Sequence, residues 1–151
     1  MNIYFIKSSE KKKILQELNE EFGIEKIPYL LIWTGKEKIR AFSGHLAKEE
    51  IMTISRLTNI EIIGLYFGKK ENNEKIRLSL DTTHILKDQI KNKIVEINEQ
   101  QLQEWLRGHD LQIQTEKGNV IIKYEQDLMG CGKSTGEKIF NYVPKDRRLK
   151  K

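Results

Sequence analysis

Short apolar runs, each bounded by glycine or polar residues, recur along the whole 151-residue chain. Residues 29–34 are nearly all apolar, and residues 75–80 alternate apolar with polar side chains, as buried and half-buried strands do. Helical spacing of apolar residues is confined to a few stretches, such as 14–22. These runs predict a mixed α+β protein of short strands, with no segment long enough to span a membrane.

Residues 1–60 predict a small α+β unit with the order β-α-β-β-α. Strands are expected at 2–6, 29–34 and 38–43, and helices at 10–22 and 47–57. Ser8 or Ser9 is expected to cap the first helix, and Gly23 to end it. The seam to a second unit is expected at residues 58–62, with the two units tightly abutted.

Residues 61–151 hold more short apolar runs than residues 1–60, which predicts a second unit built mostly of strands. Strands are expected at 60–67, 75–80, 94–97, 111–114, 120–124 and 138–143, the fifth after a turn at 117–119. Asp81 and Asn98 are expected to cap two short helices. Five or six short strands with two short helices predict a closed or nearly closed β-barrel.

The positive charge of the chain is concentrated at its C-terminal end. Residues 130–151 hold seven Lys and Arg against two Asp and Glu, whereas residues 1–129 are balanced, so the whole net charge of +5 comes from this stretch. A balanced body with one basic end is typical of a protein that binds a polyanion, with nucleic acid the first candidate. A solvated, frayed tail is the alternative. Phe140, Tyr142 and Pro144 favour an ordered segment. The two aromatic rings share one strand face and are expected in the core, and the alternative is that Tyr142 offers its ring to a base.

Residues 130–135, Gly-Cys-Gly-Lys-Ser-Thr, look like the end of a phosphate-binding P-loop. That motif requires glycine where this chain has Asp127, and a carboxylate there would repel phosphate. The loop must also open a helix, but Gly136 follows at once and a strand-like stretch comes next. Nucleotide hydrolysis is therefore excluded, and the Gly-x-Gly-Lys sequence is interpreted as a tight connection between two strands.

No catalytic or metal-binding constellation is found, so we expect no enzyme activity, no cofactor and no metal. Cys131 is the single cysteine, which excludes an internal disulfide and fits a small buried or turn residue. His45, His84 and His109 are scattered without further ligands at metal-binding spacing. Without a recognisable signal peptide, the protein is expected to be soluble and cytoplasmic.

Several motifs in the second half resemble the PUA-like RNA-binding domain. The version they resemble lies at the C-terminus of NOL1/NOP2/Sun-type (RsmF-like) RNA methyltransferases and also occurs as free-standing archaeal proteins. The first unit resembles a pre-PUA domain of ribosome-assembly factors. The motifs are residues 64–69 (Gly-Leu-Tyr-Phe-Gly-Lys), 77–81 (Arg-Leu-Ser-Leu-Asp), 105–108 (Trp-Leu-Arg-Gly), 130–133 and 141–148 (Asn-Tyr-Val-Pro-Lys-Asp-Arg-Arg).

The resemblance implies a PUA-like β-pseudobarrel that binds structured RNA, such as rRNA or tRNA, in RNA modification or ribosome biogenesis. It implies contacts from the first barrel helix and from the last strand with its flanks, although Lys87-Asp88-Gln89 stands where such domains commonly have glycine. Asn141 is expected to point outward and to hydrogen-bond RNA. The alternative is a protein-interaction adaptor that docks on an RNA methyltransferase or a preribosomal factor. The predicted RNA-binding residues are Lys87, Lys91, Lys133, Lys138, Asn141, Lys145, Arg147 and Arg148.

Overall fold

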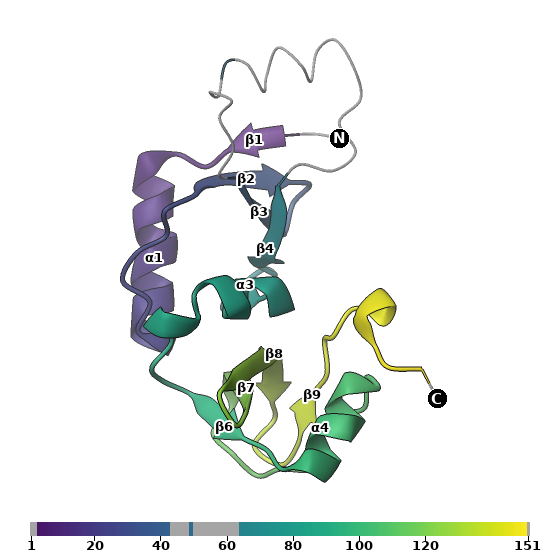
Figure 1. Ribbon diagram of the computed structural model, residues 1–151. Helices are drawn as coiled ribbons and strands as arrows, with labels where there is room; N and C mark the ends of the chain where they lie inside the picture. The colour runs from purple at the N-terminus through teal and green to yellow at the C-terminus, as the bar shows by residue number, and fades with distance from the viewer. Residues whose placement is uncertain (1–2, 43–48, 50–63, 151) are drawn as a thin grey trace.

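A computed structural model describes residues 3–42, 49 and 64–150, and shows a mixed α+β fold with two β-sheets (Figure 1). The five-stranded sheet lies in the upper half of the view and the four-stranded sheet in the lower half, with helix α3 (Leu80–Ile85) between them. The helix expected at 47–57, the first part of the strand expected at 60–67 and the seam expected at 58–62 lie outside the described residues.

The five-stranded sheet is antiparallel throughout and has the strand order β1-β2-β3-β4-β5. Strands β1 to β3 come from the predicted first unit, and β4 and β5 come from the stretch expected to begin the barrel. One sheet therefore joins the two halves of the chain. Its strands are β1 (Ile3–Phe5), β2 (Leu30–Thr34), β3 (Lys38–Phe42), β4 (Leu65–Lys69) and β5 (Arg77–Leu78).

Helix α1 (Ser8–Phe22) covers one face of this sheet. It buries Ile14, Leu18 and Phe22, as the apolar spacing predicts, and ends at Gly23 in the left-handed conformation. The predicted start is wrong in detail. Lys7 is the N-cap and makes no side-chain capping bond, because Ser8 already lies inside the helix.

The four-stranded sheet has the order β6-β7-β8-β9, with β6 and β7 parallel and the other pairs antiparallel. Two predicted turns lie inside its strands: Gly118 and Asn119 begin β7, and residues 130–133 form the middle of β8. The strand expected at 111–114 is reduced to a single bridge between Leu111 and Ile139. The strands are β6 (Ile94–Glu96), β7 (Gly118–Tyr124), β8 (Asp127–Ser134) and β9 (Ile139–Phe140).

Two further α-helices and two short 3-10 helices complete the described part of the chain. Helix α4 (Glu99–Leu106) begins with the predicted Asn98 cap, which forms a capping box with Gln101. Helix α3 is capped by Ser79, not by Asp81 as predicted. The 3-10 helices are η1 (Lys87–Gln89) and η2 (Lys145–Arg147).

One hydrophobic core connects both sheets. Its buried members include Leu18 of α1, Phe67 of β4, Leu86 beside α3, and Ile121 and Cys131 of the lower sheet. A second cluster surrounds Trp105, which is fully buried and donates from Nε1 to the Met129 carbonyl at 2.7 Å. The architecture is consistent with a PUA-like pseudobarrel whose first two strands also extend the N-terminal sheet.

Candidate nucleic-acid interface

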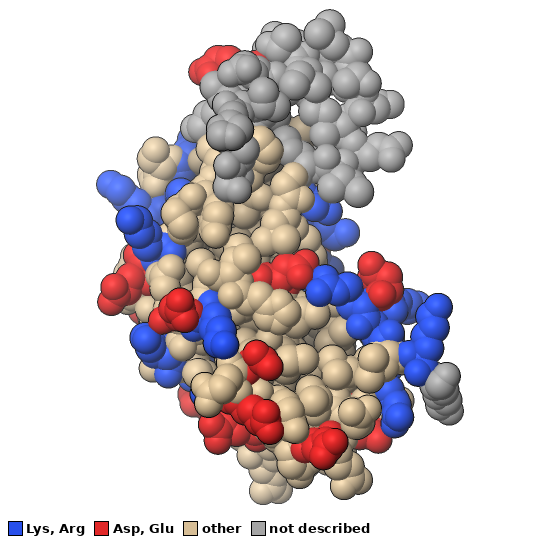
Figure 2. Space-filling model, viewed as in Figure 1, with Lys and Arg blue, Asp and Glu red and all other residues tan. Residues whose placement is uncertain are grey.

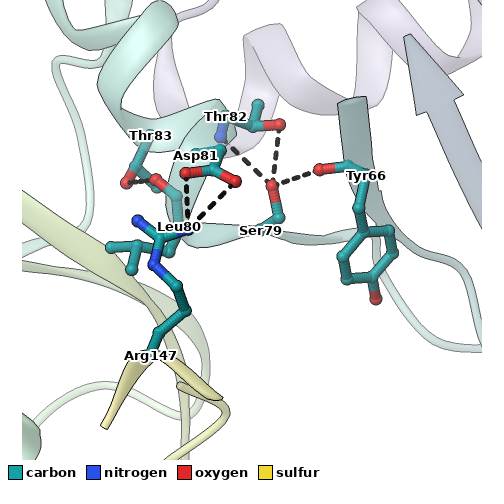
Figure 3. Close-up of polar contacts among 7 residues, drawn as sticks. All are labelled: Tyr66, Ser79, Leu80, Asp81, Thr82, Thr83 and Arg147. Atoms are coloured by element: carbon teal, nitrogen blue, oxygen red, sulfur yellow. Dashed lines mark hydrogen bonds and ion pairs between the residues drawn. The ribbon is translucent and has the colours of Figure 1, made fainter. Parts of the chain in front are cut away.

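The start of α3 forms one wall of the site (Figure 3). The Ser79 hydroxyl donates to the Tyr66 carbonyl at 2.5 Å and accepts from the Thr82 amide at 3.1 Å, which ties the helix to strand β4. Thr82, fully buried, donates to the Phe67 carbonyl. These bonds fix the position of Asp81, which follows in the first turn.

A cavity of about 90 Å³ lies between the start of α3, strand β8 and residues 142–144. Its volume is well below the roughly 300–1,000 Å³ typical of small-molecule pockets. The cavity therefore suits one part of a larger ligand better than a whole cofactor. It is lined by Tyr66, Arg77, Leu78, Ser79, Leu80, Trp105, Gly130, Cys131, Tyr142, Val143 and Pro144.

Arg77 and Tyr142 form the polar side of this cavity. The guanidinium carbon of Arg77 lies 3.6 Å from the centroid of the Tyr142 ring, a close cation–π contact. The Arg77 side chain is only 15% exposed, whereas Tyr142 is 40% exposed. Burial raises the pKa of the neighbouring Tyr66 phenol, despite the opposing charge of Arg77. The site thus presents a positively charged, partly desolvated aromatic surface.

Tyr142 and Asn141 do not lie as predicted. The sequence places Tyr142 in the core, but Ile139 and Val143 are the buried residues of this segment. Asn141 does not point outward: its amide donates to the carbonyls of Trp105 and His109, at 2.7 and 2.9 Å, and its oxygen accepts from the Val143 amide. Asn141 therefore fixes the backbone of the segment, and we do not propose it as an RNA contact.

The basic C-terminal segment lies beside the cavity and is ordered by specific contacts. Arg147 donates from Nη1 to both carboxylate oxygens of Asp81, at 3.0 and 3.3 Å, as Figure 3 shows. Arg148 donates from Nε to the Val143 carbonyl and crosses over Gly108. The Leu149 amide donates to the Leu106 carbonyl at 2.8 Å, so the segment is tied to the end of α4. It is not a frayed tail.

Lys133 and Lys138 belong to the β8–β9 hairpin. Lys133 pairs in register with Phe140, and the Lys138 ammonium lies 4.7 Å from the centroid of the Phe140 ring, so the three side chains share a face. Lys133 also pairs with Glu74 at 3.3 Å. The described structure therefore brings the predicted cations together in two groups, one on this hairpin and one on η2, where Lys145 begins the turn.

Lys87 and Lys91 do not join either group. Lys91 lies at the C-terminal end of α1, where its amide donates to the Phe22 carbonyl at 2.7 Å. Lys87 lies in η1, after the C-terminal end of α3, whereas Asp81 lies at the N-terminal end of that helix.

Figure 2 shows blue side chains gathered on the C-terminal segment at the right of the view.

Arg77 and Tyr66 are functional candidates that the sequence does not indicate as RNA contacts, and the sequence offers Tyr142 only as the alternative to a core residue. The alternation in residues 75–80 predicts that Arg77 faces away from the core, but not that it meets Tyr142 from the other end of the chain. That contact exists only because β5 and the segment after β9 are brought together by the two sheets. No local pattern carries this information.

The thiol of Cys131 is fully buried, and burial raises its pKa to about 12. It is therefore protonated at neutral pH and is not a nucleophile. Among the described residues, no group of three or more His, Cys, Asp or Glu is arranged to hold a metal ion. In the same part of the chain no helix is long and apolar enough to cross a bilayer.

The fold has two sheets around α3 and a small cavity, lined by Arg77 and aromatic residues, between that helix, strand β8 and residues 142–144. These features define the class as an α+β protein consistent with a PUA-like pseudobarrel. The family model of the methyltransferase RsmF PUA domain matches residues 92–149. The resemblance inferred from the sequence motifs is thereby confirmed.

Curated relatives extend the similarity to nearly the whole chain. The chain is 26% identical over 146 residues to the ribosomal RNA small subunit methyltransferase F of Vibrio cholerae serotype O1, in strains M66-2 and ATCC 39315. The match covers 94% of this chain but only 30% of the length of those relatives.

Proposed function

We propose that this chain is a non-catalytic RNA-binding module that recognises structured RNA, rRNA before tRNA, in the context of rRNA modification. The observation that carries the proposal is the cavity in which Arg77 lies against the exposed ring of Tyr142. Arg147 is held nearby by Asp81, which follows the lining residue Leu80. The match to the PUA domain of an rRNA methyltransferase supports the same function. A cytoplasmic location fits this role.

The chemistry of the site suits a ribonucleotide. An exposed aromatic ring offers a stacking surface to an unpaired base, and Arg side chains bind phosphate with two parallel hydrogen bonds. Arg147 is held by Asp81 in an ion pair whose side chains are 43% and 38% exposed. Such exposed pairs contribute little stability, so a phosphate can replace the carboxylate at small cost.

A catalytic role has no support in the described site. The cavity is small, and its sulfur atom is a buried, protonated thiol. The similarity to the methyltransferases covers less than a third of their length. We therefore propose binding, and not methyl transfer, for this chain.

The proposal is tested by the double substitution Arg147→Ala/Arg148→Ala in filter-binding titrations with purified small-subunit rRNA. We expect weaker binding at moderate salt, and a salt slope that falls by about 0.7–0.9 for each phosphate that is no longer bound. The matched control is Lys12→Ala/Lys13→Ala on the exposed face of α1, which removes the same charge. Equal affinities for the two double variants would contradict the proposal.

A second candidate is docking on a catalytic partner, which the partial-length match to a methyltransferase favours. In that case the chain would hold an RNA methyltransferase or a ribosome-assembly factor near its RNA. A pull-down of such a partner that survives nuclease treatment and removal of residues 144–151 supports docking. Release of the partner on nuclease treatment supports RNA binding alone.

A further inference from the structure

A second, polar hollow adjoins the aromatic cavity at Arg77. Its lining holds four cations and two carboxylates, and Arg77 is the residue that it shares with the cavity. The hollow itself has only about 10 Å³ of free space, roughly enough for one water molecule. It is lined by Lys69, Glu71, Glu74, Lys75, Arg77, Asn119 and Lys133.

The ion pairs inside this hollow are long. Lys133 lies 3.3 Å from Glu74, Lys69 lies 3.4 Å from Glu71, and Arg77 lies 3.9 Å from Glu71. Strong charge-assisted hydrogen bonds of this type measure about 2.7–2.9 Å. The carboxylates therefore pair with the cations without the best geometry. Glu37, outside the lining, also pairs with Lys69 at 3.4 Å, so the four lining cations meet three carboxylates and keep an excess of one positive charge.

Lys70, the neighbouring cation, makes shorter polar contacts than the cations of the hollow. It donates from Nζ to Glu17 at 3.0 Å and to the Glu74 carbonyl at 2.6 Å. The second bond, together with the bond from the Glu74 amide to the Glu71 carbonyl, fixes the backbone of Glu74. The Glu74 side chain remains half exposed, and within the described residues its carboxylate forms an ion pair with Lys133 alone. It can rotate away while the loop that carries it stays in place.

We infer that this hollow is a phosphodiester subsite of the RNA path, and that the Glu74 carboxylate occupies the place of the phosphate in the free protein. The inference rests on the proposed RNA-binding function and extends its footprint. An RNA strand that places a base on Tyr142 passes Arg77 and places its neighbouring phosphate between Lys133 and Lys75. Glu74 then lowers RNA affinity, because it must be displaced, whereas Lys133 raises it.

The test compares two substitutions that should change RNA affinity in opposite directions. In filter binding of the full chain to purified small-subunit rRNA, Glu74→Gln is expected to tighten binding about 2- to 5-fold, as removal of one weak ion pair implies. Lys133→Gln is expected to weaken binding and to lower the salt slope by about 0.7. In the Lys133→Gln background, Glu74→Gln should gain less, because the two side chains act on each other.

Matched controls remove the same charges elsewhere. Glu96→Gln lies on β6, opposite Lys123 at the far end of β7 from Asn119, and Lys12→Gln lies on α1. If Glu74→Gln equals Glu96→Gln, or Lys133→Gln equals Lys12→Gln, while the wild-type chain binds, the subsite is refuted and the RNA-binding function stands. If the wild-type chain does not bind this RNA, both are refuted.

Discussion

The ring of Tyr142 lies against Arg77 on one side, and its exposed surface remains accessible to a base. Because base stacking on an aromatic side chain contributes about 1–3 kcal/mol, Tyr142→Ala is expected to weaken rRNA binding about 5- to 150-fold. Tyr142→Phe keeps the ring and should retain most of the affinity. Fluorescence anisotropy of labelled rRNA measures both.

The control for this substitution is Tyr4→Ala on β1, because Tyr4 is the most exposed tyrosine described. Its removal should leave RNA affinity unchanged. An effect of Tyr4→Ala as large as that of Tyr142→Ala would contradict a specific stacking role.

The side chain of Asn141 has a structural role. It satisfies three backbone groups, from Trp105, His109 and Val143. Asn141→Ala leaves these groups unpaired and should lower the free energy of unfolding by about 1–3 kcal/mol in urea titrations. Asn72→Ala, in an exposed turn, is the control. An unchanged urea midpoint for Asn141→Ala would show that the amide is not needed for the fold.

At the scale of elements, the link between α4 and the C-terminal segment depends on Gly108. A Cβ atom there would lie 2.4–2.6 Å from the Arg148 guanidinium group, and φ is +89°. Gly108→Ala should therefore displace Arg148 and speed hydrogen exchange of the Leu149 amide, which is bonded to the Leu106 carbonyl.

Gly118 provides the comparison, since it also has a positive φ but open space around its Cα. Gly118→Ala costs backbone strain of about 1 kcal/mol without touching the segment. The proposed link fails if Leu149 exchanges equally fast in both variants.

Elements with a local signal are predictable from the sequence. The stop of α1 at Gly23, the β2–β3 hairpin and the capping box at Asn98 each follow from a few adjacent residues. The turn predicted at residues 130–133 is wrong, because these residues continue strand β8. Gly132 is needed for another reason: a Cβ there would lie 2.4 Å from Ile139 and 2.9 Å from Trp105, so glycine permits close packing inside a strand.

The site, too, has features that local sequence predicts and features that depend on long-range contacts. The basic cluster and its ordering are visible in the sequence, whereas the Arg77–Tyr142 contact and the pairing of Lys133 with Glu74 depend on long-range placement. Asn119 is a similar case. The sequence predicts a turn there, but the buried Asn119 amide donates to the Ile76 carbonyl at 3.0 Å, so its role depends on a residue near the other sheet.

At the scale of the whole molecule, Cys131 reports on the shared core. Burial raises its pKa to about 12, whereas an unfolded cysteine titrates near 8.5. Above that pH the unfolded chain gives up a proton that the native chain keeps. The free energy of unfolding should therefore fall as pH rises from about 8.5 to 10, by at most about 1.4 kcal/mol per unit.

Urea titrations across this range measure the slope, and Cys131→Ala should flatten it. The raised pKa values of Tyr66, Tyr124, Lys69 and Lys93 add slope of the same sign near the upper end of the window, so the thiol is measured by the difference between the wild-type and Cys131→Ala slopes. A slope that is equal in both proteins would show that the thiol is already exposed in the native state.

The common core has a consequence for how such a protein can be inherited. Residues 92–149 carry the family match, yet Ile121 and Cys131 within them share their interior with Leu18 and Phe22 of α1. A gene fragment that carried only this stretch into a new host would deliver strands with one bare apolar face. Residues 92–149 therefore depend on packing against α1, which agrees with a similarity to the methyltransferases that spans nearly all of this chain.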